Sequence, residues 1–168
     1  LSLVGSEMCI RDSAATDILE SARDGYDDAT VQEKLAKYGI TDEEYAIMKS
    51  HVEKGAEILK SFTLVNHVEE GALYHHERYD GKGYMYGLKG EEIPLNARII
   101  GIADTFDAMT ANRVYRKKLD KDYVLGEIRR GSGTQFDPEL VDIMLRLIDS
   151  GRIDIDSLYK GGEADEDK

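Results

Sequence analysis

The chain has little of several features that would assign it to a secreted, membrane or polyanion-binding class. Its single cysteine, Cys9, excludes an internal disulfide and favours a reducing, cytoplasmic compartment. Lysine and arginine number 22 against 34 aspartates and glutamates, and the net charge of −12 argues against nonspecific binding to nucleic acid or to an anionic membrane surface. No apolar run approaches the roughly 20 residues that a membrane-spanning helix needs. A small phosphate ligand would therefore need a local basic patch.

Alternating β-branched runs are also scarce, and from Ala14 onward the apolar residues recur with helical spacing. Both prolines and most glycines fall between these helical segments. A chain of 168 residues with 41% hydrophobic and 33% charged residues fits one domain with one core. The sequence predicts an all-α domain over 14–151. Helices are expected at 41–60, 64–77, 95–111, 122–130 and 138–150.

The two ends of the chain do not follow this pattern. The segment 1–13, LSLVGSEMCIRDS, resembles the translated read-through of a sequencing-library adapter, and we expect it to be non-native. A genuine N-terminal strand or helix is the alternative. Residues 152–168 end in an acidic stretch without apolar anchors, and we expect them to form a disordered tail.

The run HHERYDGKGY at 75–84 carries the clearest chemical signal. Neutral imidazole is the commonest protein ligand for transition metals, and adjacent histidines on a helix diverge by about 100°, so His75 and His76 can point at two different ions. Alternatively, both could cap a helix C-terminus as cations. Glu77 and Asp80, followed by closely spaced glycines, favour the metal site.

Asp104 lies on the expected central helix with apolar residues at helical spacing on either side of it. A bare charge in an apolar stripe is costly, so the carboxylate needs a cationic partner, a proton or a metal ion. The histidines favour the metal, because His51, His75 and His76 are expected to face the same interior. His67 lies outside the motif, and we assign it no role.

The glycine-rich segment 79–93 is expected to form one long shaped loop, since helix interiors rarely tolerate Gly81, Gly83, Gly87 and Gly90 so close together. Beyond the central helix, the run ANRVYRKK at 111–118 is a basic cluster in an acidic chain. It suits contact with phosphate, although cations also favour a helix C-terminus.

Together with GTQFDPELV at 133–141, the run HHERYDGKGY resembles the HD-GYP family, bacterial hydrolases of the signalling nucleotide cyclic di-GMP. The resemblance covers about 16–150 and implies a helical bundle of the HD superfamily with two or three divalent metal ions, usually iron or manganese. It places metal ligands at His51, His75, His76 and Asp104. Attack of a hydroxide on phosphorus would give linear pGpG and then GMP.

The same resemblance implies residues that bind the nucleotide. Arg113, Arg116 and Lys117 match positions near the ligand phosphates, and Tyr84 in the loop is expected to stack on guanine. The motif loop itself consists of Glu77, Asp80, Gly81 and Gly83. The implied partners are a cyclic dinucleotide and other signalling domains or proteins.

Two departures from the family pattern bear on activity. Met85 stands where the family has the proline of Gly-Tyr-Pro. The family's leading His-Asp pair, followed by Gly-Lys, is absent and would fall within 1–13. We therefore expect this chain to be inactive and the intact gene product to be the enzyme. The alternatives are a degenerate regulatory module that binds nucleotide or a partner protein, and a hydrolase of another phosphoester.

Overall fold

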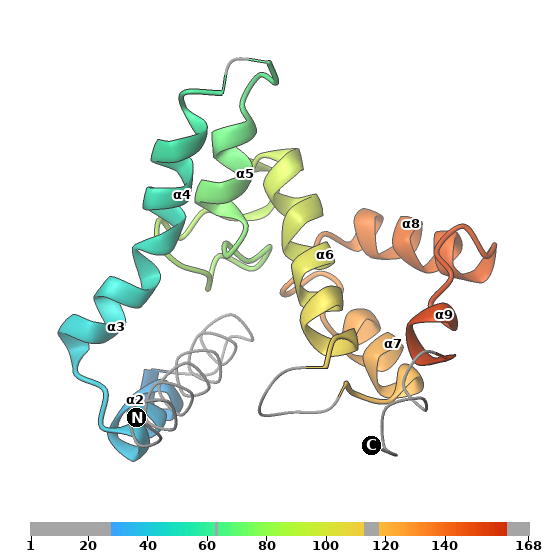
Figure 1. Cartoon of the computed structure of the whole chain (residues 1–168), viewed down its shortest axis with the longest axis horizontal. Coiled ribbons are helices and arrows are strands. Elements are labelled where there is room, and N and C mark those ends of the chain that lie inside the picture. Colours follow the sequence, from blue (N-terminus) through green and yellow to red (C-terminus); the bar gives the residue numbers. More distant parts are fainter. Residues whose placement is uncertain (1–27, 63, 113–117, 161–168) are drawn as a thin grey trace, which may run out of the picture.

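The computed structural model of the chain describes residues 28–62, 64–112 and 118–160, and these are predominantly helical (Figure 1). Within them the only strand-like pairing is an isolated bridge between Ser132 and Phe136. The all-α prediction is confirmed. The helices are α2 (Asp28–Tyr38), α3 (Asp42–Lys49), α4 (His51–Leu59), α5 (Val68–Tyr74), α6 (Leu95–Thr110), α7 (Lys121–Arg130), α8 (Pro138–Asp149) and α9 (Ser157–Lys160), with a short 3-10 turn, η1 (Gly90–Glu92).

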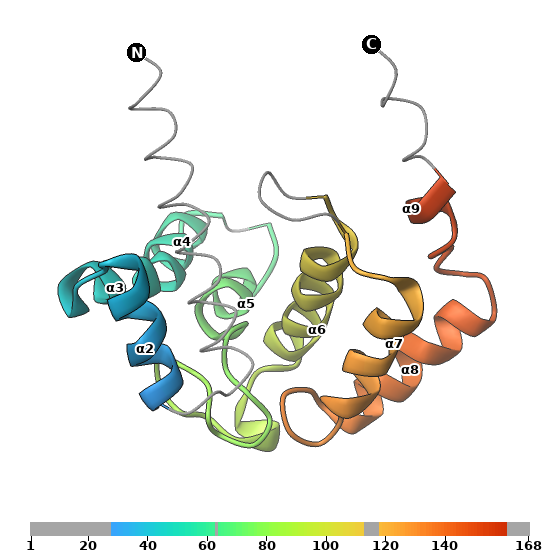
Figure 2. The same cartoon turned by 90° about the horizontal axis from the view of Figure 1, so that it is seen from below.

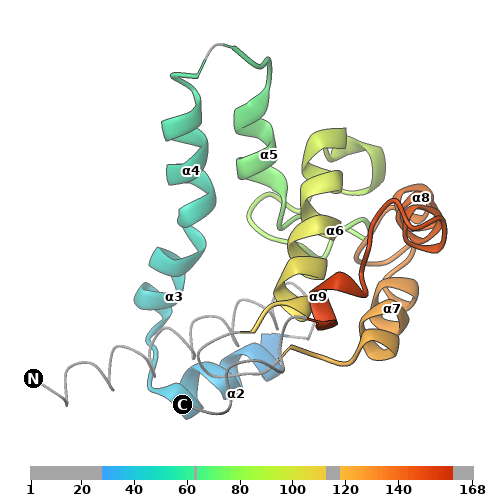
Figure 3. The same ribbon diagram turned by 45° about the vertical axis from the view of Figure 1, so that its right-hand side comes forward.

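The helix expected over 41–60 is divided into α3 and α4, which follow one another almost in line (Figure 3). Its start is as predicted, because Thr41 and Glu44 form a reciprocal capping box. The division falls at Ser50, whose hydroxyl donates to the carbonyl of Ile47 over 2.6 Å. Serine side chains inside helices compete in this way for backbone groups. The interruption makes His51 the first residue of α4.

The next helix, α5, is shorter than the expected 64–77. His67, immediately before it, has a φ of 59°, a left-handed conformation that a right-handed helix cannot continue through. The prediction that Leu64 and Val65 face the core is wrong, because their exposed fractions are 84% and 54%. The C-terminal end agrees with expectation, since His75 caps α5 and His76 follows it.

Helix α6 is central to the arrangement, with α5 on one side and α7 and α8 on the other (Figures 1 and 2). Both α6 and α8 begin where Pro94 and the pair Asp137-Pro138 predict, and Asp137 accepts a hydrogen bond from the backbone N–H of Glu139. One buried apolar cluster fills the space between α6, α7 and α8. Its members are Ile102, Met109, Val124, Ile128, Phe136 and Val141.

Two glycines allow α5 and α6 to approach closely. A Cβ atom on Gly71 would lie 2.6 Å from Cδ1 of Ile100, and one on Gly101 would lie 2.8 Å from the carbonyl oxygen of His75. Both distances are shorter than real carbon contacts allow. The absence of side chains at these positions therefore sets α6 directly against the end of α5 that carries the histidine pair.

We expect Gly101→Ala to destabilise the chain, whereas Gly55→Ala should be neutral or stabilising. Both glycines lie inside helices, so each alanine gains about 1 kcal/mol of helix propensity. The Cβ at position 55 would make only an ordinary 3.6 Å contact with Ala72, but the one at 101 meets backbone. Overpacking of this kind costs about 1–3 kcal/mol. Equal denaturant-unfolding free energies for the two variants would contradict this view of the α5–α6 contact.

Residues 152–160 differ from the disordered tail expected for 152–168. Ile155 is buried, α9 follows it, and the hydroxyl of Tyr159 donates to the carbonyl of Leu119 over 2.7 Å. The buried Ile155 and the bond from Tyr159 to Leu119 thus hold this segment against the fold, which the composition did not indicate. The predictions for 1–13 and 161–168 fall outside the described residues. Among the described helices, none combines the length and apolar character needed to cross a bilayer.

Candidate metal centre

Three histidines, one at the start of α4 and two just after α5, lie close together. The Nε2 atoms of His51 and His76 lie 3.1 Å apart, and one ligand atom from each of His51, His75 and His76 lies within 4.8 Å of the others. The rings of His75 and His76 have centroids 4.0 Å apart. His76 is buried, His75 is half-buried and His51 is exposed. The structure therefore brings together three of the four residues for which the sequence predicts metal ligation.

The donor atoms of this cluster suit a divalent cation. Nδ1 of His75 lies 2.8 Å from the carbonyl oxygen of Ala72, which can only accept, so Nδ1 carries the proton and the lone pair of a neutral ring is on Nε2. Between His51 and His76, two nitrogens of the same kind face each other. Imidazole ligands about 2.0–2.1 Å from a common ion lie roughly 3 Å apart when they are adjacent in its coordination sphere. The observed 3.1 Å agrees with that spacing.

His75 is held in the neutral form that a metal requires. Burial lowers the pKa of His75 and outweighs the raising effects of the hydrogen bond to Ala72 and the charge of Asp104; the nearby His51 adds to the lowering. The net direction is downward from the usual value of about 6.5. At neutral pH the ring is uncharged, and its Nε2 lone pair is available for coordination.

Asp104 lies close enough to His75 for its charge to act on that imidazole. The carboxylate is half-buried, so the expectation that it lies deep in an apolar stripe is wrong. Ala97 and Ala108 on that stripe are buried, but Ile100 is 42% exposed, which shows that the stripe runs along the margin of the core. Burial alone therefore does not force Asp104 to have a counter-ion. Its role as a ligand stays a prediction.

The two acidic residues of the motif organise the loop. The carboxylate of Glu77 accepts hydrogen bonds from the backbone N–H groups of Tyr86 and Leu88, at 2.7 and 3.0 Å. Asp80 accepts from the guanidinium of Arg78, at 3.1 and 2.8 Å, and from the N–H of Lys82. The sequence alone predicted no such structural role for either acid. A carboxylate beside a glycine-rich loop, whose backbone donors need acceptors, was the available signal.

Glycine is needed in the loop for two different structural reasons. Gly81, Gly87 and Gly90 have positive φ angles of 82°, 68° and 59°, which favour glycine. Gly83 does not, but a Cβ there would lie 2.4 Å from the nitrogen of Arg78 and 2.6 Å from the carbonyl oxygen of His76. The loop therefore folds back directly onto the backbone at and after His76, in agreement with the long loop expected there.

The second motif, GTQFDPELV, packs against the first. The backbone N–H groups of Tyr79 and Asp80 donate to the carbonyls of Gln135 and Thr134, at 3.2 and 2.8 Å. Asp137 also pairs with Arg98 of α6, and both side chains are largely buried. Nothing in the sequence analysis indicated this role for Arg98. The two stretches that carry the family resemblance are thus joined through their backbones and anchored to α6.

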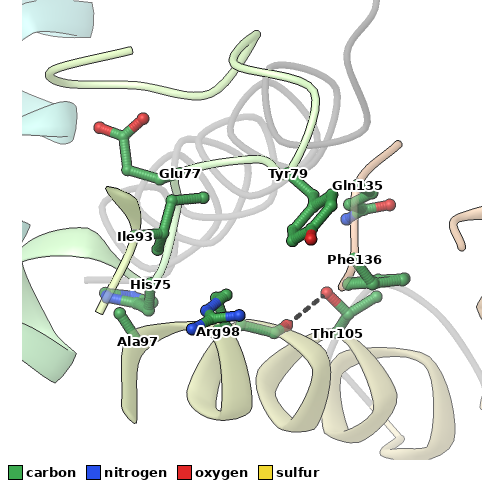
Figure 4. A pocket seen from close by; sticks show the side chains of 10 residues that line it. His75, Glu77, Tyr79, Ile93, Ala97, Arg98, Thr105, Gln135 and Phe136 are labelled. Carbon is green, nitrogen blue, oxygen red and sulfur yellow. Dashed lines mark hydrogen bonds between the residues drawn. The ribbon is translucent and has the colours of Figure 1, made fainter. Parts of the chain in front are cut away.

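A small pocket lies between the first motif, the second motif and α6 (Figure 4). His75 and Glu77 line one end, Gln135 and Phe136 line the other, and Arg98 reaches into it from α6. The space open to a water-sized sphere is about 20 Å³, which holds about one water molecule. A nucleotide cannot bind inside it, so a ligand of the histidine cluster must approach from another side.

The proposed nucleotide-binding residues divide into two groups. Arg113, Arg116 and Lys117 lie outside the described residues. Tyr84 is described, and its ring stacks on His76 with centroids 4.9 Å apart and an interplanar angle of 24°. Its contact with guanine stays a prediction.

The Asp80 carboxylate gives a testable pH dependence. Burial raises the pKa of Asp80, but the hydrogen bonds from Arg78 and the Lys82 N–H, together with the two cationic charges, lower it below the usual value of about 3.9. A depressed folded-state pKa stabilises the fold above the unfolded-state pKa, and this contribution is lost as the pH falls through the folded-state value. We therefore expect Asp80→Asn to be less stable than the native chain at pH 7, with the gap closing below about pH 4. A gap independent of pH in urea unfolding would contradict this assignment.

Comparison with known proteins gives a consistent family match. The model of the HD domain family matches residues 28–140. A cyclic di-GMP phosphodiesterase response regulator of Xanthomonas campestris is 44% identical over 110 residues, covering 64% of this chain and 29% of that protein. A cyclic di-GMP phosphodiesterase of Thermotoga maritima is 42% identical over 116 residues, covering 67% and 32%. A 3'3'-cGAMP-specific phosphodiesterase of Vibrio cholerae is 41% identical over 114 residues, covering 66% and 22%.

A solved structure agrees in fold. The crystal structure of a cyclic GMP-AMP specific phosphodiesterase of Vibrio cholerae superposes with a TM-score of 0.55 at 21% identity, over 87% of this chain and 36% of that one. The chain thus spans about a fifth to a third of the length of the curated relatives it matches.

Proposed function

The chain belongs to the HD domain family, and on that premise we propose that it is the metal-binding module of a phosphodiesterase that hydrolyses cyclic di-GMP. The observation that carries the proposal is the convergence of His51, His75 and His76. Relatives about 40% identical to it, named as cyclic di-GMP or cyclic GMP-AMP phosphodiesterases, support the substrate class.

The metal set proposed is two or three divalent ions, iron or manganese. His51, His75 and His76 would hold them, with Asp104 as an oxygen ligand, since imidazole and carboxylate suit either metal. When bound, such ions activate water for attack on phosphorus and neutralise charge on the phosphate oxygens. The chain's own contribution is to present imidazole nitrogens, and the hydrogen bond from His75 to Ala72 fixes one ring in the tautomer required.

Nucleotide binding would involve the basic stretch after α6. Arg113 and Arg116 suit bidentate contact with the phosphates, and Lys117 adds charge beside them. The product would be linear pGpG, and then GMP. We place this chemistry in the cytoplasm, in a protein whose other domains or partners supply the signal, and we propose no contact with nucleic acid or membrane.

A second function is favoured by one specific observation. The printed sequence contains no His-Asp pair, so a ligand set built on that pair is incomplete in this chain. The same residues would then form a regulatory module that binds metal and cyclic dinucleotide without turning it over. The two functions share the histidine cluster and differ in the hydrolytic step.

One experiment separates these functions. Cyclic di-GMP and 3'3'-cGAMP are incubated with manganese and either the 168-residue chain or the gene product that carries an upstream His-Asp pair, and products are resolved by chromatography. We expect pGpG only from the longer protein, inhibition by EDTA, and binding without turnover by the shorter chain. Binding of neither dinucleotide to either protein, with hydrolysis of other phosphoesters, would overturn the proposed substrate.

A further inference from the structure

The ring of Tyr84 stacks on one member of the histidine cluster, His76, with centroids 4.9 Å apart. Its ring lies nearly parallel to that of His76, with a 24° interplanar angle, whereas His51 meets His76 edge-on at 76°. The Tyr84 ring therefore covers a face of the imidazole, while His51 approaches through a ring nitrogen. His76 is only 8% exposed beneath these neighbours.

The loop backbone holds Tyr84 in this position. The N–H of Tyr84 donates to the carbonyl of His76 over 3.3 Å, so the two stacked residues are also linked through their main chains. On one side, Gly83 lies against the backbone of residues 76–78, where a side chain has no room. On the other, the Glu77 carboxylate binds the N–H groups of Tyr86 and Leu88. Hydrogen bonds and close contacts thus fix the loop both before and after Tyr84.

This arrangement restricts rotation of the His76 ring. Rotation of an imidazole about its Cβ–Cγ bond is broad and weakly preferred on its own. Around His76, the stacked Tyr84 ring and the His75 ring, with its centroid 4.0 Å away, both oppose that rotation. The ring is thereby kept with Nε2 directed at Nε2 of His51. Removing a group that orients a ligand imidazole commonly lowers metal affinity by about 10- to 100-fold.

We propose that Tyr84 is a positioning residue for His76, which orients this imidazole toward the metal. The inference rests on the proposed metal centre. It gives Tyr84 a contact with the metal ligand His76, in place of the guanine contact expected from the sequence. It also gives a reason for the close return of the glycine-rich loop, because that return places the Tyr84 ring on His76, which lies beyond the end of α5.

Manganese affinity, measured by titration calorimetry on the 168-residue chain, tests the proposal. Tyr84→Ala should weaken binding by about 10- to 100-fold, the usual effect of removing a group that orients a ligand. Tyr84→Phe keeps the flat ring and should bind as the native chain does. Tyr86→Ala is the matched control, because Tyr86 lies in the same loop, is exposed, and stacks edge-on with Tyr74 rather than with a histidine.

A spectroscopic readout separates orientation from general loosening of the loop. With cobalt at saturation, the ligand-field absorption of Tyr84→Ala should differ from that of the native chain, and Tyr84→Phe should restore it. An unchanged spectrum with a lowered unfolding midpoint would overturn the proposal and leave Tyr84 a packing role. If Tyr84→Ala does not fold, Tyr84→Leu, which keeps apolar cover without a flat ring, should show the same spectral change.

Two further outcomes are decisive. Native manganese affinity in Tyr84→Ala, with weakened binding of cyclic di-GMP, would overturn the positioning role in favour of stacking on guanine. Unaltered manganese affinity in His76→Ala would refute the metal centre itself, whatever Tyr84 does. Failure of this inference is therefore distinguishable from failure of the proposed function.

Discussion

Replacing His76 with alanine is expected to lower the affinity for manganese or iron by about 100-fold or more, since each ligand of a metal site contributes a few kcal/mol to binding. His76 is the buried member of the cluster, and its Nε2 lies 3.1 Å from that of His51. Its removal deprives the site of one donor and leaves His51 without the opposing nitrogen. Metal content per chain after dialysis, with calorimetric titration, measures the effect.

His67→Asn is the matched control. It removes an imidazole from the same part of the chain, and asparagine tolerates the left-handed backbone found there. His67 pairs with Glu70 on the surface and is not a member of the cluster. We expect its metal content to equal that of the native chain. Equal losses in the two variants would show that the metal binds histidines indiscriminately, and the site described above would be wrong.

Replacing Gly83 with alanine should have the second large effect. Its Cβ would lie 2.4 Å from the nitrogen of Arg78 and 2.5 Å from Cα of Glu77, and neither backbone atom can move without disturbing the histidine pair. The loop must shift, at a cost of about 2–3 kcal/mol in unfolding free energy. Because the neighbouring Tyr84 covers His76, metal affinity should fall together with stability.

Lys82→Ala is the control for the Gly83 substitution. The Lys82 side chain is exposed and acts on Asp80 only through its charge, while the backbone N–H bond to Asp80 is kept in the variant, so stability should change by less than about 0.5 kcal/mol. Urea unfolding of both variants tests the expectation. A Gly83→Ala chain as stable as Lys82→Ala would show that the loop does not press against residues 76–78.

The sequence predicts the fold best where its signals are local. Thr41 with Glu44 and Asp137 with Pro138 mark helix starts through hydrogen bonds made within a few residues, and the structure contains them. The interruption at Ser50 and the late start of α5 after His67 were not predictable in this way. The first accompanies a bond from the Ser50 hydroxyl to a backbone carbonyl, and the second depends on a left-handed backbone at His67; serine and histidine do not generally show either feature.

The site shows the same division. The histidine cluster was predictable because imidazoles are rare and chemically specific, and its three members meet as expected. The half-burial of Asp104 was not predictable. Helical spacing of apolar residues locates an apolar stripe on a helix, but it does not show whether that stripe lies in the core or at its edge. Nor did the sequence show that Tyr84 stacks on His76, since that contact depends on how the loop folds back.

The histidine cluster is tested most directly by anomalous X-ray diffraction from crystals of the chain grown with manganese. We expect an anomalous peak at the end of α5, within coordination distance of ring nitrogens from His51, His75 and His76. Peaks only at surface carboxylates, with the three imidazoles free of metal, would contradict the proposed metal centre.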